Sequence, residues 1–125
     1  MAHAVLVVDD DLSCLAFVEA TLEAAGEVVI KADCATDAQR LLTHQVPDIV
    51  LVDIALPGMN GLDFVRWLRS QPHLMHIPVL AMTAYSSEAM ELSAREVGCA
   101  AYLTKPLDIS TLLQTLSQSF AANES

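Results

Sequence analysis

Residues 4–11 read AVLVVDDD, so that five apolar residues, Ala4–Val8, lead directly into the three carboxylates Asp9, Asp10 and Asp11. An apolar run without alternation is typical of a strand that is covered on both faces, as in parallel sheets. Four further strand candidates follow, and three of the five are nearly continuous apolar runs. The four are VVIKA at Val28–Ala32, IVLV at Ile49–Val52, PVLAM at Pro78–Met82 and AYLT at Ala101–Thr104.

The segments between these runs have helical periodicity. Apolar residues recur at steps of three and four, which is typical of helices that bury one side. The clearest stripes are Leu15–Val18–Leu22, Leu62–Val65–Leu68, Met90–Ala94–Val97 and Ile109–Leu112–Leu116–Phe120. Asp11 and Asp108 stand where helix N-caps are expected, and Gly26 and Gly98 where helix C-termini are expected. Thr36 and Gln39 predict a capping box at the second helix.

Strand alternating with helix five times predicts an α/β fold with a doubly wound parallel sheet of five strands and five helices. The flavodoxin-like strand order 2-1-3-4-5 is the common solution for five such units. At 125 residues the chain has room for one domain, 1–125, with a core of about residues 4–120. The tail from Ala121 to Ser125 is short and polar, and we expect it to be frayed.

The composition excludes several classes of function. A net charge of −10 argues against a nucleic-acid surface, which needs a basic patch, and against binding to anionic membranes. No apolar run approaches the ~20 residues of a membrane span, and we expect a cytoplasmic protein. The three cysteines show no metal-site spacing, and we expect them to be small buried residues. The four histidines show none either, and we expect them on the surface. These residues are Cys14, Cys34 and Cys99, and His3, His44, His73 and His76.

Polar residues collect where the strands end. Ligands bind such sheets outside the carboxyl ends of the strands, at the point where the strand order reverses. Strands one and three are neighbours in the predicted order, so Asp9, Asp10 and Asp53 should converge in one crevice. Thr83 follows the fourth strand, and Lys105 follows the fifth.

Convergent carboxylates need a cation, because like charges at close range raise each other's pKa. Mg²⁺ bound through oxygens, with Mn²⁺ as a substitute, is the natural partner, and Lys105 adds a second positive charge. One carboxylate, one metal, one lysine and one hydroxyl form a coherent set for phosphoryl transfer. Asp53 is then the nucleophile that forms an aspartyl phosphate, and the Thr83 hydroxyl donates a hydrogen bond to the phosphoryl group.

The spaced pattern resembles the receiver domains of bacterial two-component response regulators, of the single-domain chemotaxis-regulator or hybrid-kinase type. The resemblance covers residues from about Ala4 to Phe120. Its motifs are VVDD at Val7–Asp10, LVD at Leu51–Asp53, LPGMNG at Leu56–Gly61, MTA at Met82–Ala84 and TKP at Thr104–Pro106.

The resemblance implies a role for each matching position. It implies that Asp53 is the phosphoacceptor and that Asp10, Asp53 and the Ala55 carbonyl bind the metal, with Asp9 acting through water. Thr83, Ala84 and Lys105 would contact the phosphoryl group, and Thr83 and Tyr102 would form the switch. Pro106 would follow a cis peptide bond. Ala55 and Tyr85 would tune the lifetime of the phosphate.

The resemblance also implies partners. A histidine kinase or a histidine phosphotransfer protein would donate the phosphoryl group, and a downstream protein would dock on the fourth helix, fifth strand and fifth helix. The chain would catalyse its own phosphotransfer and dephosphorylation without being an enzyme in the usual sense. Ala55 bears no polar group and Tyr85 is bulky, so we expect slow self-dephosphorylation.

Three other functions are compatible with an α/β fold of this kind, and each needs residues that can be checked in the sequence. An aspartyl-phosphate hydrolase usually needs a second acid two residues after the nucleophile, where this chain has Ala55. A phosphorylation-independent interaction module would be expected to have lost Asp53 or Lys105, and both are present. A flavin carrier needs a hydroxyl-rich phosphate loop after the first strand, where this chain has three carboxylates.

Overall fold

Five strands alternate with five helices, and every strand pair is parallel in the order β2-β1-β3-β4-β5. The computed structural model describes residues 2–124. The elements are β1 (Ala4–Val8), α1 (Leu12–Ala24), β2 (Val28–Ala32), α2 (Ala35–Leu42), β3 (Ile49–Asp53), α3 (Gly61–Ser70), β4 (Val79–Thr83), α4 (Glu88–Glu96), β5 (Ala101–Thr104) and α5 (Ile109–Glu124). The predicted α/β class, strand order and five helices are confirmed.

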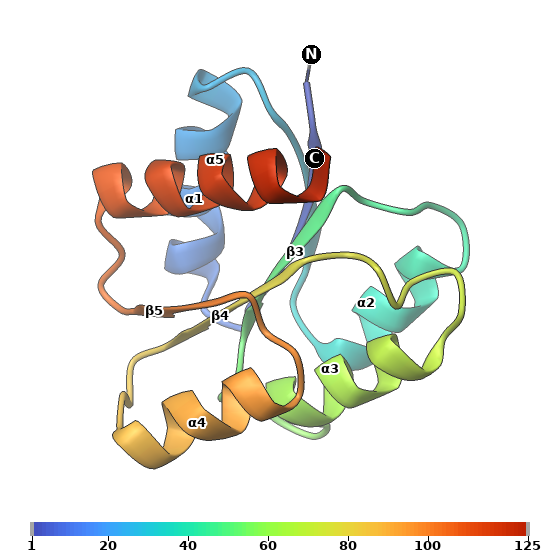
Figure 1. Cartoon of the computed structure of the whole chain (residues 1–125). Helices are drawn as coiled ribbons and strands as arrows, with labels where there is room; N and C mark the ends of the chain where they lie inside the picture. Colours follow the sequence, from blue (N-terminus) through green and yellow to red (C-terminus); the bar gives the residue numbers. More distant parts are fainter. Residues whose placement is uncertain (1, 125) are drawn as a thin grey trace.

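The sheet has helices on both faces (Figure 1), and it separates two apolar cores. One core lies under α1 and α5, and the other lies under α2, α3 and α4. Successive strand residues alternate between them, so that Val5 of β1 belongs to the first core and Leu6 to the second. Both faces of the central strands are therefore buried, which is the physical reason that these strands are apolar except at Asp53 and Thr83, the last residues of β3 and β4.

Two strands end one residue later than the sequence predicts. β3 extends to Asp53, and β4 runs from Val79 to Thr83 instead of from Pro78 to Met82. The ladder explains the shift, because Asp53 pairs with Met82 and Thr83 pairs with Thr104. Both polar residues are thus held by the sheet itself and not by a loop.

The helix caps agree with the sequence in α1 and α5 and differ in α2. Asp11 accepts hydrogen bonds from the amides of Ser13 and Cys14, and Asp108 accepts one from the amide of Thr111. The predicted capping box of Thr36 and Gln39 is wrong. Helix α2 begins at Ala35, its N-cap is Cys34, and the Cys34 Sγ accepts from the Asp37 amide at 3.4 Å.

Helix α5 is the longest helix and continues through Glu124. The expected fraying from Ala121 is therefore wrong up to Glu124, and Ser125 lies outside the described residues. The ring of Phe120 in α5 stacks on His3 with centroids 3.7 Å apart, which ties the last turns to the start of β1. None of the helices in residues 2–124 combines the length and the apolar character needed to cross a bilayer.

Candidate functional site: an acidic cluster with one lysine

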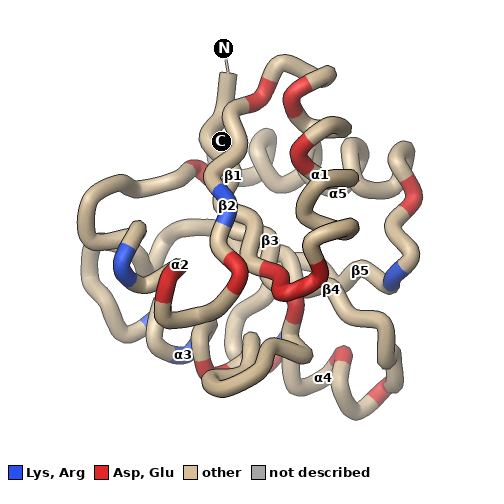
Figure 2. The backbone as a smooth tube through the Cα atoms, turned by 180° about the vertical axis from the view of Figure 1, so that it is seen from behind, with Lys and Arg blue, Asp and Glu red and all other residues tan. Residues whose placement is uncertain are grey.

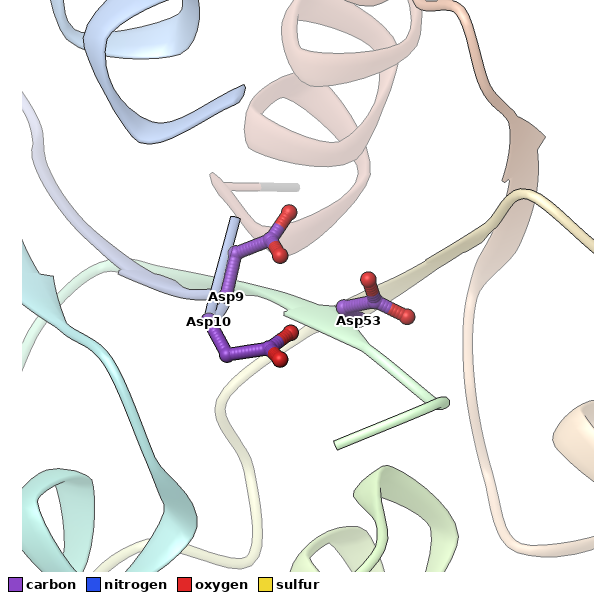
Figure 3. A group of neighbouring side chains, drawn as sticks. All are labelled: Asp9, Asp10 and Asp53. Carbon is purple, nitrogen blue, oxygen red and sulfur yellow. The ribbon is translucent and has the colours of Figure 1, made fainter. Parts of the chain in front are cut away.

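Three carboxylates meet at the carboxyl edge of the sheet, as predicted. Asp9 and Asp10 follow β1, Asp53 ends the neighbouring β3, and one carboxylate oxygen of each lies within 4.8 Å of the others (Figure 3). Asp11 and Asp33 follow β1 and β2 in the sequence, and Figure 2 shows acidic segments gathered at this end of the sheet. The cluster results from the strand order, which makes β1 and β3 neighbours although 42 residues lie between Asp10 and Asp53.

Asp9 is fully buried, with 0% of its surface exposed. Its amide donates to the Ala32 carbonyl of β2, and its Oδ1 accepts from the Asp11 amide at 2.9 Å. Its Oδ2 lies 2.7 Å from the Lys105 ammonium but outside hydrogen-bonding geometry, and it accepts no hydrogen bond in the described part of the chain. A buried carboxylate oxygen without a hydrogen-bond donor is costly unless a cation approaches it.

Asp53 is 5% exposed and both of its oxygens accept hydrogen bonds. Oδ1 accepts from the Ala55 amide at 2.8 Å, and Oδ2 accepts from the Lys105 ammonium at 2.7 Å. The Ala55 bond bends the chain directly after β3 and places residue 55 beside the carboxylate. Ala55 itself is exposed, and its side chain is a methyl group that adds no polar contact to the site.

Lys105 neutralises part of the cluster. Burial alone lowers its pKa, but the hydrogen bond to Asp53, the close contact with Asp9 and the charges of both carboxylates outweigh burial and raise the pKa above its ordinary value. The ammonium is therefore firmly protonated near neutral pH. One positive charge faces three carboxylates, so the site as a whole keeps a negative excess.

The donor set fits a divalent cation. The three candidate side-chain ligands are carboxylates, whose oxygens hard ions such as Mg²⁺ prefer, and the exposed Asp10 leaves an open side for water. The Lys105 ammonium already lies 2.7 Å from the Asp9 Oδ2, and a divalent cation would offset the negative charge of the three carboxylates that one lysine leaves. The acidic cluster could therefore bind a metal.

The predicted phosphoryl-binding and switch residues lie along β4 and β5. Thr83 is 1% exposed, and its hydroxyl accepts a hydrogen bond from the Tyr85 amide at 3.0 Å. Ala84 is exposed, and Tyr85 has 77% of its surface exposed. The ring of Tyr102 packs against the core under α2, α3 and α4, and its buried hydroxyl finds no hydrogen-bond partner in residues 2–124.

The loop after β5 completes the wall of the site. The peptide bond between Lys105 and Pro106 is cis, as the resemblance implies. The Lys105 amide donates to the Thr83 carbonyl, which continues the pairing of β4 and β5 up to the ammonium that contacts Asp53. A cleft of about 440 Å³ adjoins this wall, with Ala84, Lys105, Pro106 and Leu107 on one side and Asp11, Ser13, Cys14 and Phe17 of the α1 region on the other.

Sequence reasoning missed Cys14. Its thiol faces Asp9 from the first turn of α1, and burial, reinforced by a hydrogen bond to Asp9 and the charge of that carboxylate, raises its pKa to about 12. The thiol therefore stays protonated and unreactive near neutral pH. Asp11 supplied the only available signal, because a helix capped there brings residue 14 back over the end of β1.

The expectation of surface histidines is correct for His44, His73 and His76, which are exposed, and wrong for His3. Besides its stacking on Phe120, His3 is half-buried and its Nδ1 lies 2.9 Å from Glu27. Of the cysteines, Cys99 is buried as expected, while Cys14 and Cys34 are only partly buried. None of these residues belongs to the acidic cluster.

Comparisons with known proteins give the same assignment over nearly the whole chain. Residues 5–117 match the family described as "Response regulator receiver domain". The polar-differentiation response regulator DivK of Brucella ovis is 33% identical over 116 residues, which cover 93% of this chain and 94% of that protein.

Two solved structures are also similar. The chemotaxis response regulator CheY4 of Vibrio cholerae is 31% identical with a TM-score of 0.90, covering 95% of this chain and 99% of that chain. The receiver domain of the sensor histidine kinase PA1611 from Pseudomonas aeruginosa PAO1 is 26% identical with a TM-score of 0.88, covering 97% of this chain and 99% of that chain. It is described with a magnesium ion coordinated in its active-site cleft.

The strand order, the acidic cluster and the family match agree with one another. Two-component signalling, through which such proteins work, pairs them with histidine kinases. This chain belongs to the response regulator receiver domain family.

Proposed function

We propose that this protein is a phosphorylation switch that accepts a phosphoryl group onto Asp53 in a Mg²⁺-dependent reaction. A histidine kinase or a histidine phosphotransfer protein supplies the group, and the phosphorylated protein controls a partner through the face formed by α4, β5 and α5. The observation that carries the proposal is the Asp53 carboxylate, which lies beside Asp9 and Asp10 and is bound by the Lys105 ammonium. The cytoplasm, where histidine kinases present their phosphorylated histidine, is the compartment that this reaction requires.

The reaction needs positioning and neutralisation of charge more than covalent machinery. An oxygen of Asp53 forms the new O–P bond while the N–P bond of the phosphohistidine breaks, and the imidazole leaves with the electron pair and takes a proton from solvent. The ammonium of Lys105 shifts from the Asp53 carboxylate to the phosphoryl oxygens. The Thr83 hydroxyl and the Ala84 amide donate to the same group.

The residues that would hold Mg²⁺ are Asp9, Asp10, Asp53 and the Ala55 carbonyl. A Mg²⁺ ion held by these residues would neutralise negative charge on the phosphoryl oxygens. Asp9 orients the site from its buried side, because the Asp11 amide donates a hydrogen bond that holds the Asp9 carboxylate in place. Asp10 is the exposed member of the cluster and therefore the ligand that a metal reaches first.

The surface next to the site favours a protein as the donor of the phosphoryl group. Leu12 has 71% of its surface exposed and Phe17 has 36%, and both lie on the solvent side of α1. The other exposed residues of α1 include Ser13, Ala16, Ala20 and Ala24, and its charged residues are Glu19 and Glu23. An exposed helix face of this apolar character suits the face of a second helix.

The switch is proposed to run from Asp53 through Thr83 and Tyr102. The Thr83 hydroxyl turns from the Tyr85 amide to the phosphoryl group, and the Tyr102 ring responds on the neighbouring strand. The orphaned Tyr102 hydroxyl supports this role, because a buried hydroxyl without a partner costs about 1–3 kcal/mol and favours any conformation that satisfies it.

The test is labelling by acetyl phosphate with Mg²⁺, followed by the mass of the intact protein. The wild type is expected to gain one phosphoryl group and Asp53→Asn none. Asp33→Asn is the matched control, since Asp33 is an exposed carboxylate after β2 that lies outside the cluster. Asp10→Asn is expected to need at least about tenfold more Mg²⁺ for the same rate. Equal labelling of wild type and Asp53→Asn would refute the proposal.

A further inference from the structure

Arg69, in the last turn of α3, binds three backbone carbonyls through its guanidinium. One terminal nitrogen donates to Met75 at 2.9 Å and to Ile77 at 2.7 Å, and the other donates to Gly98 at 2.9 Å. Met75 and Ile77 precede β4, and Gly98 lies between α4 and β5. A single side chain thus joins two loops that are more than twenty residues apart in sequence.

The contact at Gly98 is close. The backbone of Gly98 has φ of 101°, and a Cβ added there would lie 3.0 Å from the Nε of Arg69. The guanidinium packs against the backbone at a position that favours glycine. Burial lowers the pKa of Arg69 without removing its charge, and the positive group faces the carboxyl end of α4, where helix carbonyls lack partners.

Arg69 lies at the edge of the sheet opposite the acidic cluster. Helix α4 begins five residues after Thr83, at the carboxyl edge where Asp53 lies, and runs back to the amino edge (Figure 1). There the Ala100 amide donates to the carbonyl of Val79, the first residue of β4. The first turn of α4 is therefore the end near the site, and the last turn is the end near Arg69.

The two ends of α4 also differ in burial, and the end near Arg69 is the more buried one. Its only fully buried residue is Ala94, in the second half of the helix. Around the first turn, Glu88, Ala89 and Glu91 are exposed, and the Ser87 hydroxyl caps the helix by accepting from the Met90 amide. In the first turn only the partly buried Met90 packs against the core, whereas a charged donor and a fully buried alanine hold the last turn.

We infer that Arg69 is a positioning residue that fixes the C-terminal end of α4 at Gly98, so that phosphorylation at Asp53 displaces the N-terminal end of α4 about this fixed point. The inference rests on the proposed function for the signal that moves α4. The anchoring of Gly98 by Arg69 does not depend on that function and is tested separately.

The first test measures amide hydrogen exchange without any ligand in Arg69→Gln. We expect exchange at Cys99 and Ala100 to rise about tenfold, because their amides bond to Ala94 and Val79 in the segment that Arg69 holds. Arg66→Gln is the matched control, since Arg66 lies one turn earlier on α3 and pairs with Asp63 of its own helix. Unchanged exchange in Arg69→Gln would overturn the anchoring.

The second test follows amide chemical shifts when beryllofluoride and Mg²⁺ are added as a phosphoryl mimic. In the wild type and in Arg66→Gln, the changes along α4 should be largest at residues 87–91 and small at residues 95–98. In Arg69→Gln they should spread to residues 95–98, whereas a merely structural role would leave the gradient as it is. The same gradient in both Arg variants would overturn the inference.

The two arms separate the inference from the proposed function. If the wild type shows no shift changes around Asp53, the proposed function fails, and the exchange measurement still decides whether Arg69 anchors Gly98. If Arg69→Gln does not fold, Arg69→Lys replaces it in both arms. Lysine keeps the charge but lacks the two-nitrogen fork that spans the two loops.

Discussion

Lys105 is the residue on which the charge balance of the acidic cluster depends. Its ammonium lies 2.7 Å from both Asp9 and Asp53, and its side chain is only 12% exposed. Removing one partner of a buried ionic group leaves the others uncompensated, which costs more than the pair itself contributes. The effect of this lysine on stability should therefore be large without metal and smaller with it.

We predict that Lys105→Met lowers the free energy of unfolding by roughly 2 kcal/mol without metal and that Mg²⁺ recovers part of the loss. The folded-state pKa of Lys105 is raised, so its contribution is fully present below the unfolded lysine pKa of about 10.4 and is lost as pH rises toward the folded pKa. In urea denaturation, the difference between wild type and variant should be constant from pH 7 to about 10 and shrink above that. Lys31→Met, which removes an exposed pair with Glu19, is the control. A difference that already falls between pH 7 and 9 would contradict the assignment.

Ala55 and Tyr85 are proposed to set how long the phosphate lasts. Hydrolysis needs a water in line with the acyl phosphate, and the Ala55 side chain offers it no hydrogen bond. We predict that Ala55→Asn combined with Tyr85→Glu accelerates decay of the phosphorylated protein about tenfold, the factor that 1.4 kcal/mol of transition-state stabilisation gives. Tyr85→Phe, which keeps the bulk, should decay like the wild type. Equal rates for the double variant and the wild type would show that neither position controls the water.

Among the elements, α3 is the helix whose start constrains the proposed phosphorylation site at Asp53. Gly61, its first residue, donates its amide to the Ile54 carbonyl, and a Cβ added there would lie 2.5 Å from the Asp53 carbonyl oxygen and 2.4 Å from the Ile54 Cα. These are backbone atoms, which cannot move aside as a flexible side chain can. Gly61, the second glycine of the LPGMNG motif, is required because α3 begins in contact with the end of β3.

We predict that Gly61→Ala lowers the free energy of unfolding by roughly 1–3 kcal/mol and slows labelling of Asp53, because it displaces the strand end that carries the carboxylate. Gly58→Ala is the control, since Gly58 has φ of 73° but nothing within 4 Å of an added Cβ. It should cost about 1 kcal/mol of stability and leave the labelling rate near that of the wild type. Urea denaturation and labelling kinetics measure the two effects, and normal labelling in Gly61→Ala would contradict the argument.

Features that follow from sequence patterns could be predicted, whereas contacts that only the folded chain brings together could not. The strand order and the convergence of Asp9, Asp10 and Asp53 follow from apolar runs and from general rules for parallel sheets. The cap of α2 could not be read correctly, because Thr36 and Cys34 compete for the same role and the thiol is the weaker acceptor by type. The three hydrogen bonds from Arg69 to backbone carbonyls have no sequence signal, since they join loops that only the folded sheet brings together.

At the scale of the whole molecule, the acidic edge and the proposed output face are separate regions joined by β4 and β5. Thr83 is the last residue of β4 and pairs with Thr104 of β5, one residue before Lys105. The proposed route from Asp53 to α4 and α5 therefore passes through two adjacent strands that both contribute to the site. A protein built in this way can report a local change of charge on a distant surface.

We predict that Thr83→Ala separates binding of the mimic from the response. With beryllofluoride and Mg²⁺, amide shifts around Asp53 should persist, because the carboxylate cluster and Lys105 are intact. Shifts along residues 88–97 and 101–113 should fall to less than about half of those in the wild type, since no hydroxyl moves toward the bound group. Thr104→Ala, the exposed neighbour on β5, is the control. A full response in Thr83→Ala would place the connection elsewhere.

The most direct measurement of the central claim is the chemical identity of the phosphorylated residue. An acyl phosphate is reduced by borohydride to an alcohol, so a phosphorylated aspartate becomes homoserine and can be located by peptide mass spectrometry. After treatment with acetyl phosphate and Mg²⁺, the proposed function predicts homoserine at position 53 alone, and none when Mg²⁺ is removed. Homoserine at position 9, 10 or 11, or an unmodified Asp53 in protein that has gained a phosphoryl group, would contradict it.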